Sequence, residues 1–144
     1  ENFSEIEQIC NKYNIRNYTI NSDGTVDVNG DVGLRSRLTE LPLKFGKVTG
    51  HFDCRNNNLS SLEGCPKIVG CNFYCSENNL TSLEEGPIKV GGHFLCGDNQ
   101  LTSLEGVPKE IGGNLYCSTN SIYTLDGLED VQFKYINFYN YIYS

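Results

Sequence analysis

Residues Leu101–Ser121 read LTSLEGVPKEIGGNLYCSTNS, and variants of this stretch recur along the chain with a fixed period. Leu59, Leu80 and Leu101 stand 21 residues apart, and columns of Leu, Val or Ile, Phe or Leu, Cys, Asn and Pro keep the same register. Such self-similarity is typical of solenoids, in which one unit is too small to bury its apolar face alone. The sequence therefore predicts a coil of stacked turns around one continuous core.

Each unit is predicted to hold a short strand and an irregular loop. Phe73 and Cys75 alternate with polar neighbours, which is the period-2 pattern of a half-buried strand. Paired glycines such as Gly91-Gly92 predict the bend before the strand, and the segment Glu63–Lys67 contains Gly and Pro without helical periodicity. We expect a mainly β fold, or α+β once an N-terminal helix is counted, with short parallel strands and irregular convex loops.

The N-terminal part departs from the repeat, as the end of a solenoid must if it is to cover the core. Ser4 stands three residues before Glu7, the spacing of a capping box, and opens a short amphipathic stretch. Residues 18–20 and 25–28 then alternate around a polar turn, which predicts a β-hairpin. We expect a cap made of one helix and one hairpin.

The sequence thus divides into three predicted parts. Residues 1–37 form the N-terminal cap, residues 38–121 form four 21-residue repeats, and residues 122–144 form a last partial repeat with a C-terminal capping strand. The aromatic run 133–143 would be an exposed edge if it were left bare. It either caps the coil or leads into further repeats.

Two columns, one of Asn and one of Cys, are predicted to be structural ladders. Equivalent residues of successive turns lie about 4.8 Å apart, so each column forms a continuous row. A buried Asn amide can satisfy backbone groups in the bend after the strand, which water cannot reach. A Cys beside apolar columns packs as a small hydrophobic residue. The ladder residues are Asn57, Asn78, Asn99 and Asn120, together with Cys54, Cys75, Cys96 and Cys117.

Seven cysteines also suggest zinc or disulfides, and we weighed both. The chain has no C-x-x-C pair; Cys71 and Cys75 come nearest. His51 and His93 lie two turns apart, about 10 Å by strand spacing, which is too far to share one metal. An odd number of cysteines argues against a disulfide framework. We expect no metal site, and free thiols that fit a reducing cytoplasm.

Charge and motifs exclude several function classes. The net charge is -7, from 11 Lys+Arg against 18 Asp+Glu, so nucleic acid is an unlikely partner. No apolar run reaches the roughly 18 residues of a membrane span, so we expect no membrane partner. The glycine pairs precede no helix and no Gly-Lys-[Ser/Thr], which excludes a P-loop or a dinucleotide fingerprint. We expect no catalytic residue, no cofactor and no enzymatic activity.

The stretch Phe73-x-Cys75-x-x-Asn78-x-Leu80-x-x-Leu83 fits most of the pattern L-x-L-x-x-[NC]-x-L-x-x-L. The chain resembles the leucine-rich-repeat family over residues 34–138, and more closely a short 21-residue variety of tailed phages, some bacteria and large viruses. This resemblance implies a solenoid that binds proteins. A phage-type member would be directed at a host or defence protein in the cytoplasm of the host cell.

The residues that alternate with Phe-x-Cys must face outward on the strand side. Their tyrosines offer broad contact area at low entropy cost, which favours a protein interface. The predicted partner-binding residues, here called the recognition face, are Asp53, Asn72, Tyr74, His93, Leu95, Asn114, Tyr116, Tyr135 and Tyr139. The alternative is that aromatic residues stand there for β-propensity alone.

Two further functions remain open. Glu63, Glu84, Glu105 and Asp126 form an acidic column, which we interpret as a solvated loop edge rather than a stripe that steers a basic partner. An acidic mimic that occupies a nucleic-acid-binding surface is the second hypothesis. A structural repeat that associates with itself through its aromatic end is the third.

Overall fold

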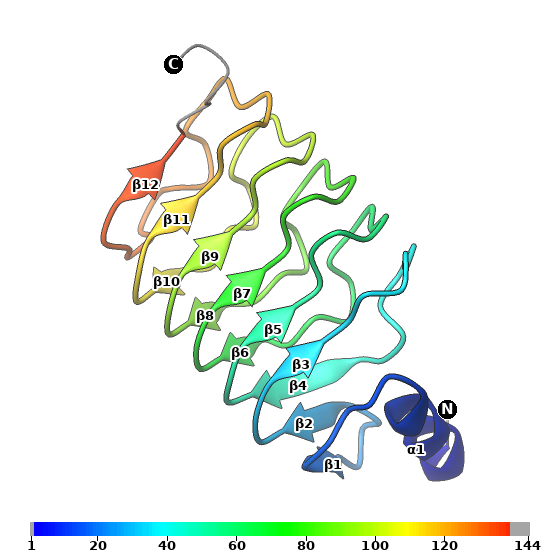
Figure 1. The fold of residues 1–144 in the computed structure, drawn as a ribbon. Helices are drawn as coiled ribbons and strands as arrows, with labels where there is room; N and C mark the ends of the chain where they lie inside the picture. Colours follow the sequence, from blue (N-terminus) through cyan, green and yellow to red (C-terminus); the bar gives the residue numbers. More distant parts are fainter. Residues whose placement is uncertain (1, 139–144) are drawn as a thin grey trace.

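A computed structural model, in which residues 2–138 are described, shows one helix followed by a coil of short strands. In Figure 1 the strands stack along the coil, loops project on one side, and the helix lies at the N-terminal end. The elements are α1 (Phe3–Lys12), β1 (Tyr18–Ile20), β2 (Val26–Val28), β3 (Val32–Gly33), β4 (Phe45–Val48), β5 (Phe52–Asp53), β6 (Ile68–Val69), β7 (Phe73–Tyr74), β8 (Lys89–Val90), β9 (Phe94–Leu95), β10 (Glu110–Ile111), β11 (Leu115–Tyr116) and β12 (Ile136–Asn137).

The strands form two six-stranded sheets. Sheet A has the order β1-β2-β4-β6-β8-β10, and sheet B has the order β12-β11-β9-β7-β5-β3. All pairs are parallel except the β1–β2 hairpin. The mainly β solenoid with stacked parallel strands and one N-terminal helix is thereby confirmed.

The structure adds a second strand to each repeated turn. The sequence pattern predicts one strand at Phe-x-Cys, whereas the valine column also lies in a strand, and these strands build sheet A. Val48 pairs with Val69, and Val69 pairs with Val90, in strict register. A two-residue strand carries no alternation that a sequence window can detect, so only its pairing with equivalent turns reveals it.

The core consists of repeated columns, as the period predicts. Phe52, Phe73 and Phe94 are fully buried and stacked, with ring centroids 5.4 and 5.3 Å apart. Buried leucines from the loops pack against them and join one cluster that runs through the coil. Such offset aromatic pairs contribute roughly 0.5–1.5 kcal/mol beyond the area they bury.

The corner between the two sheets depends on glycine. A Cβ on Gly91 would overlap the carbonyl oxygen of Gly70, and a Cβ on Gly112 would overlap that of Gly91. Backbone therefore touches backbone from turn to turn at this corner. A side chain at the first glycine of each pair would force the turns apart.

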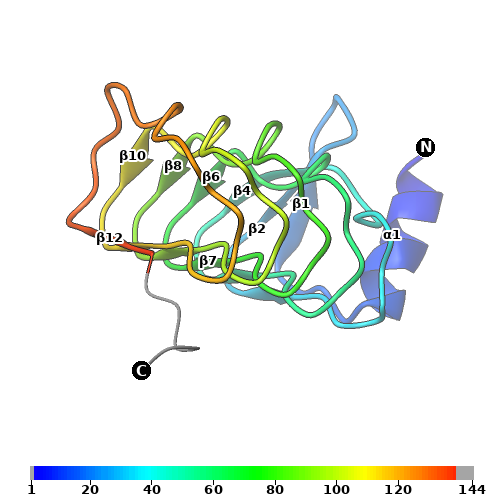
Figure 2. The same ribbon diagram turned by 90° about the horizontal axis from the view of Figure 1, so that it is seen from above.

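The N-terminal cap is a helix and a hairpin, and Figure 2 shows the helix at the N-terminal end of the coil. Ile6 and Cys10 face the core and are buried. The predicted capping box was wrong: the N-cap residue is Asn2, whose side chain accepts a hydrogen bond from the Glu5 amide at 2.9 Å. Ser4 lies inside the first helical turn, so its hydroxyl is not at the capping position.

At the other end, β12 pairs in parallel with β11. Some apolar residues of this last turn pack against the core and are partly buried, namely Ile122, Leu128, Val131, Phe133 and Ile136. Tyr123, Leu125 and Phe138 are exposed. Tyr139 and the remainder of the chain lie outside the described residues. The predicted division into parts at residues 37 and 121 stays a prediction.

Candidate functional site

The outward side of sheet B brings the central residues of the recognition face into one row. Tyr74 pairs in register with Leu95, and Leu95 pairs with Tyr116. Asp53 precedes this row in β5, and all four side chains are partly buried. Tyr135, just before β12, is 66% exposed, and Tyr139 falls outside the described residues.

Both central tyrosines are held in place by their neighbours. The amide nitrogen Nδ2 of Asn72 donates to the hydroxyl of Tyr74, and that of Asn114 donates to Tyr116, both at 3.0 Å. The His93 ring meets Tyr116 edge-on, with centroids 5.6 Å apart. These contacts fix two large amphipathic rings on the outside of the sheet.

The N-terminal end of the row is charged. Asp53 accepts a hydrogen bond from the guanidinium of Arg35 at 3.1 Å and forms an ion pair with that of Arg55 at 3.2 Å. Arg55 also lies over the Tyr74 ring, 4.6 Å from its centroid. The face thus changes from charged at β5 to aromatic and aliphatic at β7, β9 and β11.

His51 and three residues of the recognition face, Asn72, His93 and Asn114, form one column. This column has a second role that the sequence does not reveal directly. His51 Nδ1 accepts from the Asn72 amide at 3.0 Å, Asn72 Oδ1 accepts from the His93 amide at 2.8 Å, and His93 Nδ1 accepts from the Asn114 amide at 2.9 Å. Each side chain therefore holds the backbone of the following turn. One feature of the sequence points to this role, namely the second glycine of pairs such as Gly91-Gly92. A Cβ on Gly92 would overlap Asn72 Oδ1, so a glycine there leaves room for the Asn72 side chain.

The Asn ladder has the geometry expected of backbone capping. Nδ2 of Asn78 donates to the carbonyls of Cys54 and Cys75, and its Oδ1 accepts from the Leu59 amide at 3.0 Å. Asn57, Asn99 and Asn120 repeat this pattern one turn apart. Among the described residues, every buried side-chain nitrogen and oxygen has a partner.

The cysteine ladder lies in the core. Cys54, Cys75, Cys96 and Cys117 are buried, and all seven cysteines are free thiols. Burial raises the pKa of Cys54, Cys75 and Cys96 well above the usual value and that of Cys117 to about 12. Since the thiolate is the nucleophile and the metal ligand, these thiols are unreactive while the fold is intact.

The acidic column lies on a loop edge. Glu63, Glu84 and Glu105 are exposed, and the backbone amide of each donates to the hydroxyl of a serine two residues earlier, as from Glu84 to Ser82 at 2.9 Å. These short turns direct the carboxylates into solvent. The geometry fits the solvated-edge interpretation.

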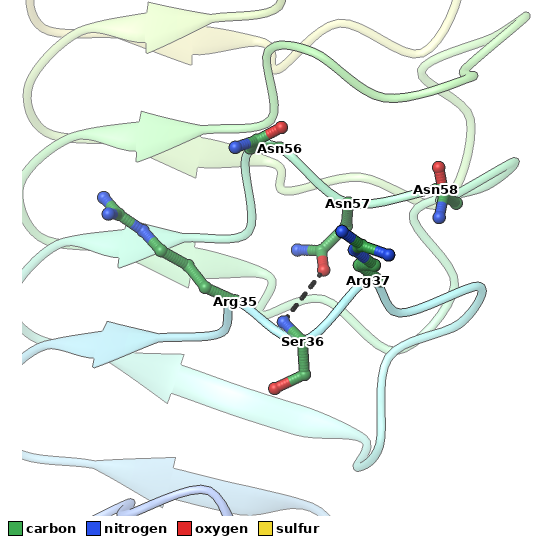
Figure 3. Close-up of a pocket in the computed structure, with 6 residues that line it drawn as sticks. All are labelled: Arg35, Ser36, Arg37, Asn56, Asn57 and Asn58. Carbon is green, nitrogen blue, oxygen red and sulfur yellow. Dashed lines mark hydrogen bonds between the residues drawn. The ribbon is translucent and has the colours of Figure 1, made fainter.

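A recess that the sequence analysis missed lies beside the first turn (Figure 3). It is shallow, has a volume of about 790 Å³, and is lined by Arg35, Ser36, Arg37, Asn56, Asn57 and Asn58. The first turn is one residue shorter than the others and has no Asn of its own, so Asn57 ends the ladder here. Its Oδ1 accepts from the amides of Ser36 at 3.3 Å and Leu38 at 2.8 Å.

In residues 2–138, no three His, Cys, Asp or Glu side chains are grouped closely enough to hold a metal ion. The same part of the chain contains no helix with the length and apolar character that crossing a membrane requires. Comparison of the chain with protein-family models, with curated proteins and with solved structures gave no match in any of the three.

Proposed function

We propose that the chain is a non-catalytic protein-recognition module that binds its partner through the recognition face. The observation that carries this proposal is the fixed position of Tyr74 and Tyr116, whose hydroxyls accept from Asn72 and Asn114. Rings that are already ordered lose little conformational freedom on binding, and tyrosine is enriched among residues that dominate interface energetics.

The repeat pattern supports a leucine-rich-repeat type of module. Parallel strands stack in register with a 21-residue period, and the Phe-x-Cys and Asn positions fall where that pattern requires strand and bend. Family members share a shape and bind unrelated partners, so the fold alone names no partner. The free buried thiols support a reducing location, the cytoplasm, which for a phage-type protein is that of the host cell.

A second candidate, self-association, is favoured by the last described turn. Tyr123 is 82% exposed, Leu125 is 60% exposed and Phe138 is 41% exposed. These side chains belong to the last described turn, and exposed large apolar side chains are typical of contact surfaces where they form a patch. The acidic-mimic hypothesis has weaker support, because its carboxylates form one loop edge instead of covering a face.

Affinity capture with the full chain as bait tests the proposal. The baits are the wild type, the double variant Tyr74→Ala/Tyr116→Ala, and the control Ile88→Ala, which changes an exposed apolar residue on the sheet A side. A partner retained by the wild type and the control, but lost from the tyrosine variant, supports the recognition face. Each anchoring tyrosine should contribute about 2 kcal/mol or more to binding.

Two results would overturn the proposal. One is a partner that survives both tyrosine changes and is lost after charge reversal at Glu84 and Glu105, which would favour the acidic column. The other is a chain that captures only itself and forms dimers disrupted by Leu125→Ser, which would favour self-association.

A further inference from the structure

Positive charge is concentrated beside the recess at the first turn. Arg35 and Arg37 line it, and no carboxylate is among the lining residues. Arg35 uses an N–H on Asp53, which leaves further donors of its guanidinium for a ligand. Among the described residues, none forms an ion pair with Arg37.

The arginines near the recess contrast with the acidic character of the whole chain. The net charge is -7, yet all four arginines lie within the first 55 residues, at positions 16, 35, 37 and 55. The amides of Asn56 and Asn58 add neutral hydrogen-bonding groups around the recess. Planar guanidinium groups bind carboxylates through paired hydrogen bonds, so the lining has the chemistry of an acid receptor.

The bend that follows the sheet B strand in each turn is acidic further along the coil. The position of Asn56 is occupied by Glu77 in the next turn and by Asp98 in the one after, and both are exposed. Along this bend, the arginines of the recess are followed by carboxylates in later turns. An acidic ligand would be attracted to the recess and repelled by Glu77 and Asp98.

Size and lining narrow the kind of ligand. The recess is shallow, and its volume of about 790 Å³ exceeds what one inorganic ion fills. No aromatic residue lines the recess, so nucleobases would find nothing to stack on. The acidic remainder of the chain also disfavours a densely charged polyanion.

We propose that this recess binds an acidic segment of a protein, with carboxylates of that segment on Arg35 and Arg37. None of the lining residues belongs to the recognition face, so this site is additional to the proposed function, although Arg35 also forms an ion pair with Asp53 of that face.

Fluorescence anisotropy with the full chain tests the proposal. The probe is a short labelled peptide of alternating glutamate and serine, and its matched control has glutamine in place of glutamate. The protein variants are Arg35→Gln/Arg37→Gln and the control Lys109→Gln/Lys134→Gln, which removes the same amount of charge at the other end of the coil. Thermal unfolding of each variant verifies that it is folded.

We expect the acidic peptide to bind the wild type and the lysine control alike, and the arginine variant at least about tenfold more weakly. Glu77→Gln should strengthen binding, and added salt should weaken it. Equal affinity for the glutamine peptide, equal loss in the lysine control, or tighter binding of single-stranded DNA or inorganic phosphate than of the peptide would each overturn the proposal.

Discussion

Asn99 shows what one residue of the ladder does. Its Nδ2 donates to the carbonyls of Cys75, Cys96 and Gly97, and its Oδ1 accepts from the Leu80 amide, so it joins two successive turns. The side chain is 8% exposed, which leaves water little access to these groups. An unsatisfied buried polar group costs about 1–3 kcal/mol.

We therefore expect Asn99→Ala to lower the free energy of unfolding by about 3 kcal/mol, the upper end of that range, because several backbone groups lose one partner together. The matched control is Asn79→Ala, at an exposed position in the adjacent turn. This variant should change the free energy of unfolding by no more than about 0.5 kcal/mol. Urea unfolding measures both. Equal midpoints for the two variants would contradict the ladder.

Substitution of His93 tests the column of His51, Asn72 and His93, in which each side chain accepts a hydrogen bond from a backbone amide of the next turn. His93→Asn should leave stability within about 0.5 kcal/mol, because Asn72 already makes the equivalent bond one turn earlier. His93→Leu should cost about 1 kcal/mol, because the Asn114 amide loses its acceptor. If thermal unfolding ranks the two variants the other way round, the hydrogen bond is not what this position contributes.

The element most sensitive to substitution is the corner between the sheets. Gly91→Ala would place a methyl group against the carbonyl of Gly70, and backbone cannot move aside as a flexible side chain can. We expect a loss of about 3 kcal/mol or more. Gly33→Ala in β3 is the control, because a Cβ there has nothing within 4 Å and should be tolerated. Urea unfolding that finds both variants alike would refute the close contact between turns.

For the whole molecule, the buried thiols predict instability in alkali. Folding raises their pKa above the ordinary value of 9.0, to about 12 for Cys65 and Cys117, because burial disfavours the thiolate. Below about pH 9 the thiols are protonated in both states, and the stabilisation is fully present. Between about 9 and 12 only the unfolded chain ionises, so each thiol removes up to about 1.4 kcal/mol per pH unit.

Cys75→Val separates this effect from the ionisation of tyrosines, which both proteins share. The variant should lose stability less steeply than the wild type in urea unfolding between about pH 9 and 11, because it has one thiol fewer. Parallel pH profiles would show that burial of the thiol is not the cause.

The repeat pattern is sufficient to predict the period, the core columns, the Asn ladder and the outward direction of Tyr74 and Tyr116. These follow from one rule: a fixed period places like residues above one another, and alternation decides which side they face. The sequence also indicated a helix and hairpin at the N-terminus, although it misplaced the N-cap from Asn2 to Ser4.

Tertiary structure alone decided the second sheet, the bonds of His51, Asn72 and His93 to the next turn, and the recess at Arg35 and Arg37. Each depends on contact between residues of different turns, roughly 20 positions apart in the chain. A strand of two residues has no local signature, and a polar side chain on the surface does not reveal its acceptor. The recess lies beside the first turn, and its lining comes from two successive turns that only the stacking of the coil brings together.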